Sequence, residues 1–349
     1  MGENMAENKK LDYSVLSKRR NDLFGISIVS IVIFHFFLSC QNAGVHTALA
    51  NQYVALVGRV GVPIFLVLSG MGLFFSLSRN YNLKDFYKKR LVRILIPYLI
   101  VSVIHFFLRY IIIQGKGFLA FLKGVFFIDF ITKGNSQFWF IALMLIMYAV
   151  YPLLFKIFKS GKRNLLKLGL LVGLVIVCNF AISKLMPTIY DNISVMLTRI
   201  PAFIIGVYLG EKVYNKREVH PAFWIVSALG SAAFIYFSIN ENMLGVSPPT
   251  SLVIRYGETV YGLFLMMTLS VVLEAINSLR FSKLCAFFGG MSLELYMIHV
   301  SLRSLMGLVG FKSANVLYYF IMVLIAIALS FALQKFDSFA TKKLTSKKV

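Results

Sequence analysis

The sequence is poor in the residues that mark soluble and secreted domains. Only 14% of its 349 residues are charged, and 14 are Asp or Glu against 36 Lys and Arg. Its three cysteines, Cys40, Cys178 and Cys285, stand far apart, without the close spacing of a metal site or a disulfide framework. A zinc module and a disulfide-rich secreted scaffold are therefore excluded, and we expect the cysteines to be buried apolar fillers.

The sequence is rich in apolar residues. Hydrophobic residues make up 58% of the chain and aromatic residues 15%, and the mean hydropathy is +0.78. Soluble domains rarely exceed roughly half apolar residues. A helix that crosses the hydrocarbon core of a bilayer needs about 20 mainly apolar residues, and runs of that size recur along almost the whole chain. We therefore expect an all-α integral membrane protein.

The apolar runs predict ten transmembrane helices. They cover residues 22–40, 56–77, 94–113, 137–158, 165–183, 198–214, 221–239, 257–276, 287–306 and 316–336. The stretch GFLAFLKGVFFIDFI (117–131) is too short and too charged to span, so we expect it to lie at the interface or to re-enter. This divides the chain into an N-terminal tail (1–20), a transmembrane domain (21–337) and a basic C-terminal tail (338–349).

The distribution of cations predicts the orientation. With ten spans, 26 of the 36 Lys and Arg fall on the tails and loops of one side. Because cytoplasmic loops carry the excess of Lys and Arg, we expect both termini to be cytoplasmic. Contact with anionic membrane lipids then explains the net charge of +22, and no nucleic-acid partner is needed.

Two histidines inside apolar spans are the first candidates for function, because polar groups are costly in lipid. His35 lies about 13 residues into the first span, roughly 20 Å from its start. In the ninth span Ser292, Tyr296, His299 and Arg303 share one helix face, which predicts a polar cavity with His299 at nearly the depth of His35. For each histidine two roles stay open, a reacting group or a hydrogen bond between helices.

Arginines near the span ends also have two interpretations. Arg59, in GRVGVPIFLVLSGMGLFF, is either an interfacial anchor or a ligand for an oxyanion or acidic sugar. The loop FYKKRLVRILIPY places Arg90 and Arg93 three residues apart, on one side of a helix, next to Lys88 and Lys89. This cluster is either a topology signal or a site for a phosphate-rich cytosolic ligand, since guanidinium groups bind phosphate bidentately.

Six fragments, in this order, carry a resemblance to a known family: RRNDLFGISIVSIVIFHFF, GRVGVPIFLVLSGMGLFFS, FYKKRLVRILIPYLI, SQFWFIALMLIMYAVYPLL, RIPAFIIGVYLG and GGMSLELYMIHVSL. Together they resemble the membrane-bound acyltransferase family 3, whose best-known bacterial members O-acetylate surface polysaccharides and peptidoglycan. The resemblance covers nearly all of residues 19–336.

The resemblance implies roles for particular residues. His35 matches the family's catalytic base, Arg90 and Arg93 match its Arg-x-x-Arg pair, and Tyr296 and His299 match its late tyrosine–histidine pair. Trp139 matches the tryptophan that opens the fourth span, and a glycine-valine-phenylalanine-serine-glycine helix matches Gly61, Val62, Phe65, Ser69 and Gly70.

One position departs from the family pattern. The family usually has an arginine eleven residues before the histidine, and here that residue is Phe24. Arg20 lies about one turn further down, roughly 60° off that face. Either Arg20 and the Arg90/Arg93 pair take over donor binding, or the chemistry differs from that of the family.

From these observations we expect an O-acyltransferase in a bacterial plasma membrane. The acyl donor would be acetyl-CoA or another acyl-CoA, without a metal, and the acceptor a hydroxyl of a surface or lipid-linked glycan. We assign His35, His299 and Tyr296 to catalysis, with an acyl-histidine on His35 as the alternative to general base catalysis. The donor would be bound by Arg90, Arg93, Lys89 and Arg20, and the acceptor by Arg59, Ser69 and Trp139.

Two further possibilities stay open at this point. One is a transporter or flippase for a lipid-linked sugar or small anion, with His35, Arg59 and His299 as binding and proton-relay groups. Against it, the two halves of the chain show no paired repeat. The other is a scaffold that has lost activity, and assembly into a homodimer is likewise left open.

Overall fold

The computed structural model describes residues 10–240, 248–311 and 314–345. Within these ranges the chain is helical, and the β-pairing consists of one isolated bridge between Asp12 and Glu218. The first half contains α1 (Ser14–Lys18), α2 (Arg20–Asn42), α3 (Ala48–Gln52), the π-helix η1 (Tyr53–Val57), the 3₁₀-helix η2 (Gly58–Val60), α4 (Gly61–Arg79), α5 (Leu83–Phe106), the π-helix η3 (Phe107–Ile113), α6 (Phe118–Val125), α7 (Ile128–Lys133) and α8 (Trp139–Lys159).

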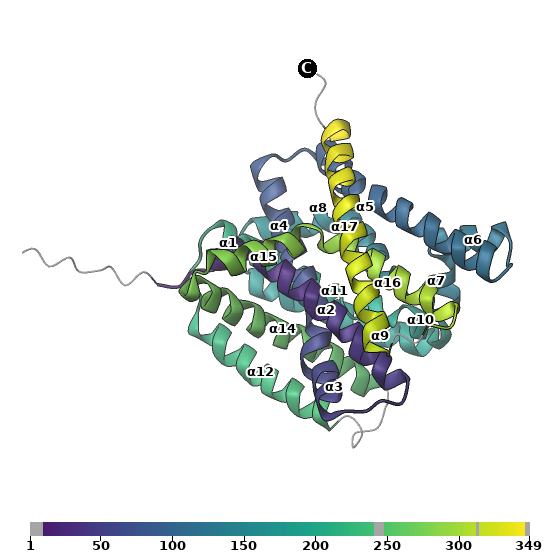
Figure 1. The fold of residues 1–349 in the computed structure, drawn as a ribbon. Coiled ribbons are helices and arrows are strands. Elements are labelled where there is room, and N and C mark those ends of the chain that lie inside the picture. The colour runs from purple at the N-terminus through teal and green to yellow at the C-terminus, as the bar shows by residue number, and fades with distance from the viewer. Residues whose placement is uncertain (1–9, 241–247, 312–313, 346–349) are drawn as a thin grey trace, which may run out of the picture.

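The second half is also helical (Figure 1). They are α9 (Asn164–Leu185), α10 (Pro187–Leu197), α11 (Ile200–Tyr214), α12 (Pro221–Ile239), α14 (Pro248–Ile276), α15 (Leu279–Gly290), α16 (Ser292–Leu308) and α17 (Val316–Thr345). In the described residues nine helices are long and apolar enough to cross a membrane, which confirms an all-α, multi-pass architecture.

The ninth predicted span differs from a straight helix. The chain bends by 62° between α15 (Leu279–Gly290) and α16 (Ser292–Leu308), so α16 alone carries the polar face that the sequence indicates. Gly289 explains the bend's position, because a Cβ there would meet the backbone of Asn21 in α2. The close α2–α15 contact thus fixes where α16 begins.

Other expectations are confirmed or corrected by the packing. Residues 117–131 form the short helices α6 and α7, which extend from one side of the bundle (Figure 1). Cys40 and Cys285 are buried, but Cys178 is exposed, because α9 packs on the outside of the bundle with few buried residues. The predicted N-terminal tail holds α1, where Val15 and Leu16 are buried, and α17 continues past residue 337 to Thr345.

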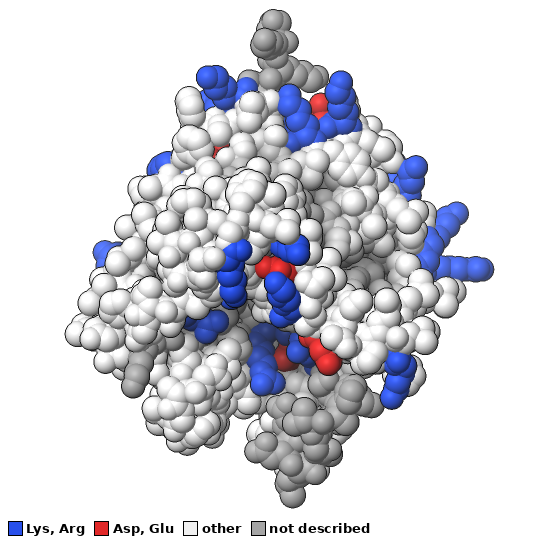
Figure 2. All heavy atoms as spheres, turned by 90° about the vertical axis from the view of Figure 1, so that its right-hand side faces the viewer, with Lys and Arg blue, Asp and Glu red and all other residues white. Residues whose placement is uncertain are grey.

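The outer surface suits a lipid environment. Many large apolar side chains are exposed, for example Leu166, Leu170, Leu174 and Val177 along α9. Figure 2 shows a face that is mostly uncharged and on which Lys and Arg far outnumber Asp and Glu. A surface this apolar would be unstable in water and is stable against lipid tails.

The tightest helix contact is between α4 and α11, and it leads to a stability prediction. At Gly206 a Cβ would lie 2.8 Å from Val67 Cα, closer than real Cβ contacts occur. We expect Gly206→Ala to destabilise the protein by about 1–3 kcal/mol through overpacking, measured as a lower melting temperature in detergent. Gly173→Ala is the control, since nothing lies within 4 Å of a Cβ there. Equal melting temperatures for the two variants would contradict the contact.

Candidate functional site

Two adjoining cavities open at one end of the bundle. Their volumes are about 280 and 340 Å³, and they share Arg20, Ser69, Arg90 and Tyr148 in their walls. Arg20 and Arg90 lie near the starts of α2 and α5, whereas Ser69 and Tyr148 lie in α4 and α8, which run the other way. The four helices therefore bring one shared polar section together, which we call the mouth.

The mouth is strongly cationic. Arg20, Arg90 and the exposed Arg79 line it, and no ion pair joins any of them to a carboxylate in the described ranges. Arg20 lies over the Phe24 ring, 4.7 Å from its centroid, and the Nε atoms of Arg20 and Arg90 are buried without a hydrogen bond. Arginines without counter-ions in a membrane protein mark a binding site for an anion.

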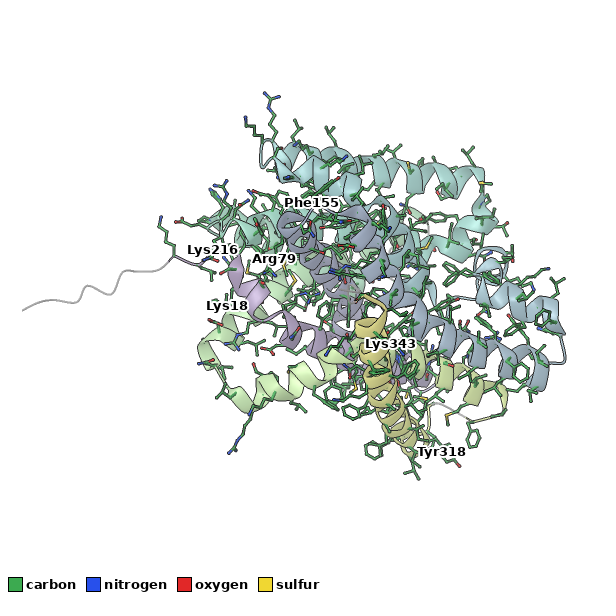
Figure 3. The ribbon with its side chains drawn as sticks, turned by 90° about the horizontal axis from the view of Figure 1, so that it is seen from above. Lys18, Arg79, Phe155, Lys216, Tyr318 and Lys343 are labelled. Carbon is green, nitrogen blue, oxygen red and sulfur yellow. The ribbon has the colours of Figure 1, made fainter. Side chains whose placement is uncertain are left out.

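Arg79 marks the end of the molecule at which the mouth opens. Figure 3 shows Arg79, Lys18 and Lys216 toward one edge, away from Tyr318 at the start of α17. The neighbouring Tyr319 bonds the Val32 carbonyl, deep along α2 from Arg20. Charged and apolar ends of the cavity system are therefore well separated along the bundle.

Arg93 differs from Arg20 and Arg90 in having carboxylate partners. It lines the cavity, but Nη1 lies 3.3 Å from Glu294 Oε1 and forms a second ion pair with Asp337. Both carboxylate side chains are fully buried. Because two carboxylates already neutralise Arg93, its contribution is to join α5, α16 and α17 beside the mouth.

This triad leads to a second stability prediction. Arg93→Met leaves Glu294 and Asp337 buried without a cation, and breaking such a pair costs about 3–5 kcal/mol. We expect a large drop in melting temperature in detergent. Adding Glu294→Gln and Asp337→Asn to the same variant should recover most of it. A single Arg93→Met variant as stable as the wild type would contradict the structural role.

The inner end of the smaller cavity is apolar. Ile31, Phe65, Phe140 and Tyr296 form its wall there. The Tyr296 hydroxyl donates to the Gln137 carbonyl at 2.9 Å, and its ring lies 6.2 Å from that of His299. The cavity thus ends one side chain away from the paired histidines, and neither histidine belongs to its wall.

His35 and His299 are directly hydrogen-bonded. His299 is fully buried, and its Nδ1 lies 2.7 Å from the Leu295 carbonyl, so Nδ1 carries the proton. His299 Nε2 then accepts from His35 Nδ1 at 2.9 Å. His35 Nε2 is left as an acceptor with no hydrogen bond in the described structure, and the residue is partly exposed. A fixed tautomer with an open lone pair is the arrangement of a general base.

One helical turn beyond the two histidines, α2 and α16 make a second contact. Arg303 Nη1 donates to Ser39 Oγ at 3.3 Å, and Ser39 Oγ donates to the His35 carbonyl at 2.8 Å. Arg303 has no carboxylate partner in the described part of the chain. A cation therefore lies beyond the histidine pair, on the side away from the mouth.

The structure separates the other predicted site residues into two groups. Ser69, predicted to bind the acceptor, and Tyr296, predicted to be catalytic, both line the cavities. Lys89 is exposed and Trp139 packs partly buried against the core, and neither lines a cavity. Arg59 lies 4.0 Å from Glu258, which also pairs with Arg199, so it belongs to a separate cluster on α14 and α11.

Three residues at or near the site have no counterpart among the sequence candidates. Arg79 lines the mouth, Asp337 pairs with Arg93, and the fully buried His105 bonds Ser301 Oγ at 2.9 Å on the other face of α16. His105 gives the same signal as His35, a titratable residue within an apolar span. In the sequence, Arg79 and Asp337 cannot be told from ordinary charged residues of loops and helix ends. No group of His, Cys, Asp or Glu in the described ranges could hold a metal ion.

The fold and the site define a class: a multi-pass helical membrane protein whose cationic mouth leads toward a histidine pair. The chain belongs to acyltransferase family 3, because the family's profile, an acyltransferase domain, matches residues 25–335. A relative named "Putative acetyltransferase ORF330", from Acidianus two-tailed virus, is 24% identical over 317 residues, covering 87% of this chain and 90% of its own. No solved structure matches the chain. The resemblance in the six fragments is thereby confirmed.

Proposed function

We propose that this acyltransferase moves an acetyl group from acetyl-CoA to a hydroxyl of a surface or lipid-linked glycan, in a bacterial plasma membrane. The observation that carries the proposal is a cationic mouth whose cavity ends one side chain, that of Tyr296, away from the hydrogen-bonded pair His35 and His299. Membership of the family supports acyl transfer, and the excess of cations on the mouth side supports a mouth open to the cytoplasm.

The donor would bind by charge at one end and by apolar contact along the rest. Arg20, Arg79 and Arg90 would hold the phosphate groups of CoA, which supply the anions these arginines lack. The pantetheine arm would then follow the apolar wall past Ile28 toward Phe65 and Tyr296. Phe24 lies on this path, because it lines the cavity and Arg20 lies over its ring.

His35 would take and return the proton in the proposed reaction. Its Nε2 takes the proton of the acceptor hydroxyl as the oxygen attacks the thioester carbonyl, forming a tetrahedral intermediate. The C–S bond then breaks, and the proton returns from His35 to the CoA thiolate. Because Tyr296 separates the cavity from His299, its ring would turn aside to admit the thioester. Arg303, near the His35 turn, would stabilise negative charge beyond the histidines.

The deciding experiment uses the purified protein with labelled acetyl-CoA and a thiol reagent that reports free CoA. We expect CoA release that depends on a hydroxyl acceptor, with the label found as an ester on that acceptor. A folded preparation that releases no CoA with any neutral or acidic saccharide would leave the transporter as the better explanation. Uptake of labelled saccharide into proteoliposomes would then be the measurement.

A further inference from the structure

A polar cluster lies at the opposite end of α16 from the mouth. Ser304 Oγ accepts from Arg109 Nη1 at 3.2 Å and from Gln137 Nε2 at 3.4 Å. Arg109 lies over the Tyr110 ring, and the Tyr110 hydroxyl accepts from Asn135 Nδ2 at 3.0 Å. Three separate segments, η3, the turn before α8, and α16, therefore converge here.

A π-helical turn builds part of the cluster. In η3 the Gln114 N–H bonds the Arg109 carbonyl, five residues earlier, at 3.1 Å. In an α-helix, residues five apart point about 140° away from each other. The wider π turn brings Gln114 back over Arg109, and such turns are frequent at functional sites.

Four buried polar atoms of the cluster have no hydrogen-bond partner in the described structure. Gln114 Oε1, Asn135 Oδ1, Gln137 Oε1 and Arg109 Nε are all buried, and none has a partner within the described structure. Each such atom costs about 1–3 kcal/mol if it stays unpaired. Three are amide oxygens, which require donors such as sugar hydroxyls, and one belongs to a cation.

Cations outnumber carboxylates around the cluster. The nearby carboxylate, Asp129, is buried beside the Tyr110 hydroxyl and forms an ion pair with Lys133 at 3.1 Å. Arg109 has no carboxylate partner in the described ranges, and Lys116 adds a second cation over the Tyr110 ring. A ligand that completes the cluster should therefore present hydroxyl groups together with an oxyanion.

We infer that Arg109, Gln114, Asn135 and Gln137 form the acceptor subsite, and that the acceptor is a saccharide bearing a carboxylate or phosphate. The inference rests on the proposed function, which requires a hydroxyl acceptor opposite the CoA side. The subsite adjoins the reaction centre through Gln137, whose carbonyl accepts from Tyr296, the residue in contact with His299. The negative group binds Arg109, and the hydroxyls bind the amide oxygens.

Binding is tested first, without catalysis. Purified protein in detergent is titrated by calorimetry with three probes: methyl glucoside, methyl glucuronoside and glucose 1-phosphate. We expect the two anionic probes to bind about tenfold more tightly than the neutral one, in line with a charge-assisted hydrogen bond. Comparing the two anionic probes tells carboxylate from phosphate recognition.

Variants test whether Arg109 causes the preference for the anionic probes. Arg109→Gln should remove the preference for the anionic probes, whereas Lys184→Gln, which removes an exposed charge outside the cluster, should keep it. Gln114→Leu should weaken the binding of all three probes alike, and it serves as the test if Arg109→Gln does not fold. No preference in the wild type, or equal losses in Arg109→Gln and Lys184→Gln, overturns the subsite.

The transfer assay separates this inference from the proposed function. Arg109→Gln should raise the acceptor KM about tenfold and leave the acetyl-CoA KM unchanged. If the wild type binds acidic saccharides as expected but transfers nothing, the proposed function fails and the binding site stands. If it transfers acetyl groups and Arg109→Gln changes neither acceptor KM nor preference, the subsite fails alone.

Discussion

His35→Ala should abolish acetyl transfer while the protein still folds. A positioned base contributes typically about 10²–10⁴-fold to the rate, so we expect a loss of at least that size in kcat. The substitution leaves the buried Nε2 of His299 without its partner, so we expect a modest drop in melting temperature in detergent and a protein that is still folded. The measurement is the initial rate of labelled ester formation at saturating acetyl-CoA.

A matched variant tests whether the effect belongs to this ring alone. His46 is exposed, and His46→Ala should keep full activity. His299→Leu removes the acceptor that fixes the His35 tautomer, so we expect a smaller loss of kcat and a displaced pH–rate profile. Full transfer by His35→Ala would remove the histidine from the mechanism and leave His299 with a purely structural role.

His35→Ala also distinguishes general base catalysis from a route through an acyl-histidine. Intact mass spectrometry after mixing the wild type with acetyl-CoA, without acceptor, would reveal an acetylated ring that His35→Ala lacks. General base catalysis leaves no such adduct, because the acceptor oxygen attacks the thioester itself. The open Nε2 of His35 can serve in either route, so this measurement chooses between them.

Most of the fold follows from the sequence because span length and apolar composition are set by the bilayer itself. Nine predicted spans correspond to long apolar helices in the described structure. The bend before α16 does not follow, because it depends on the contact of Gly289 with the α2 backbone, between residues far apart in sequence. Exposure of Cys178 was missed for the same reason, since hydropathy does not reveal which helix lies outermost.

The site was predictable where helix geometry alone decides it. Counting residues from the span ends placed His35 and His299 at one depth, and they form a hydrogen bond. Arg93 could not be assigned in this way. Its partners, Glu294 and Asp337, come from two later helices, and only their packing shows that its charge is already neutralised. Arg20 and Arg90 are distinguished from Arg93 by the absence of such partners in the described chain.

The arginines of the mouth give the second large expected effect. Arg20→Gln combined with Arg90→Gln should raise the KM for acetyl-CoA by about 100-fold or more, because hydrogen bonds to charged groups contribute about 1.5–3 kcal/mol each. Little change in acceptor KM is expected, since both residues line the mouth and not the far end of α16. Steady-state kinetics with acetyl-CoA varied at fixed acceptor measure the effect.

Lys88→Gln combined with Lys89→Gln is the matched control. It also removes two positive charges, both from α5, the helix of Arg90, but both lysines are exposed and line neither cavity. If binding required only a positive surface potential, the two double variants would weaken acetyl-CoA equally and the loss would disappear at high salt. A direct contact predicts that the Arg20/Arg90 variant loses far more affinity than the lysine variant, and that the difference persists at high salt, because partly buried pairs are screened less.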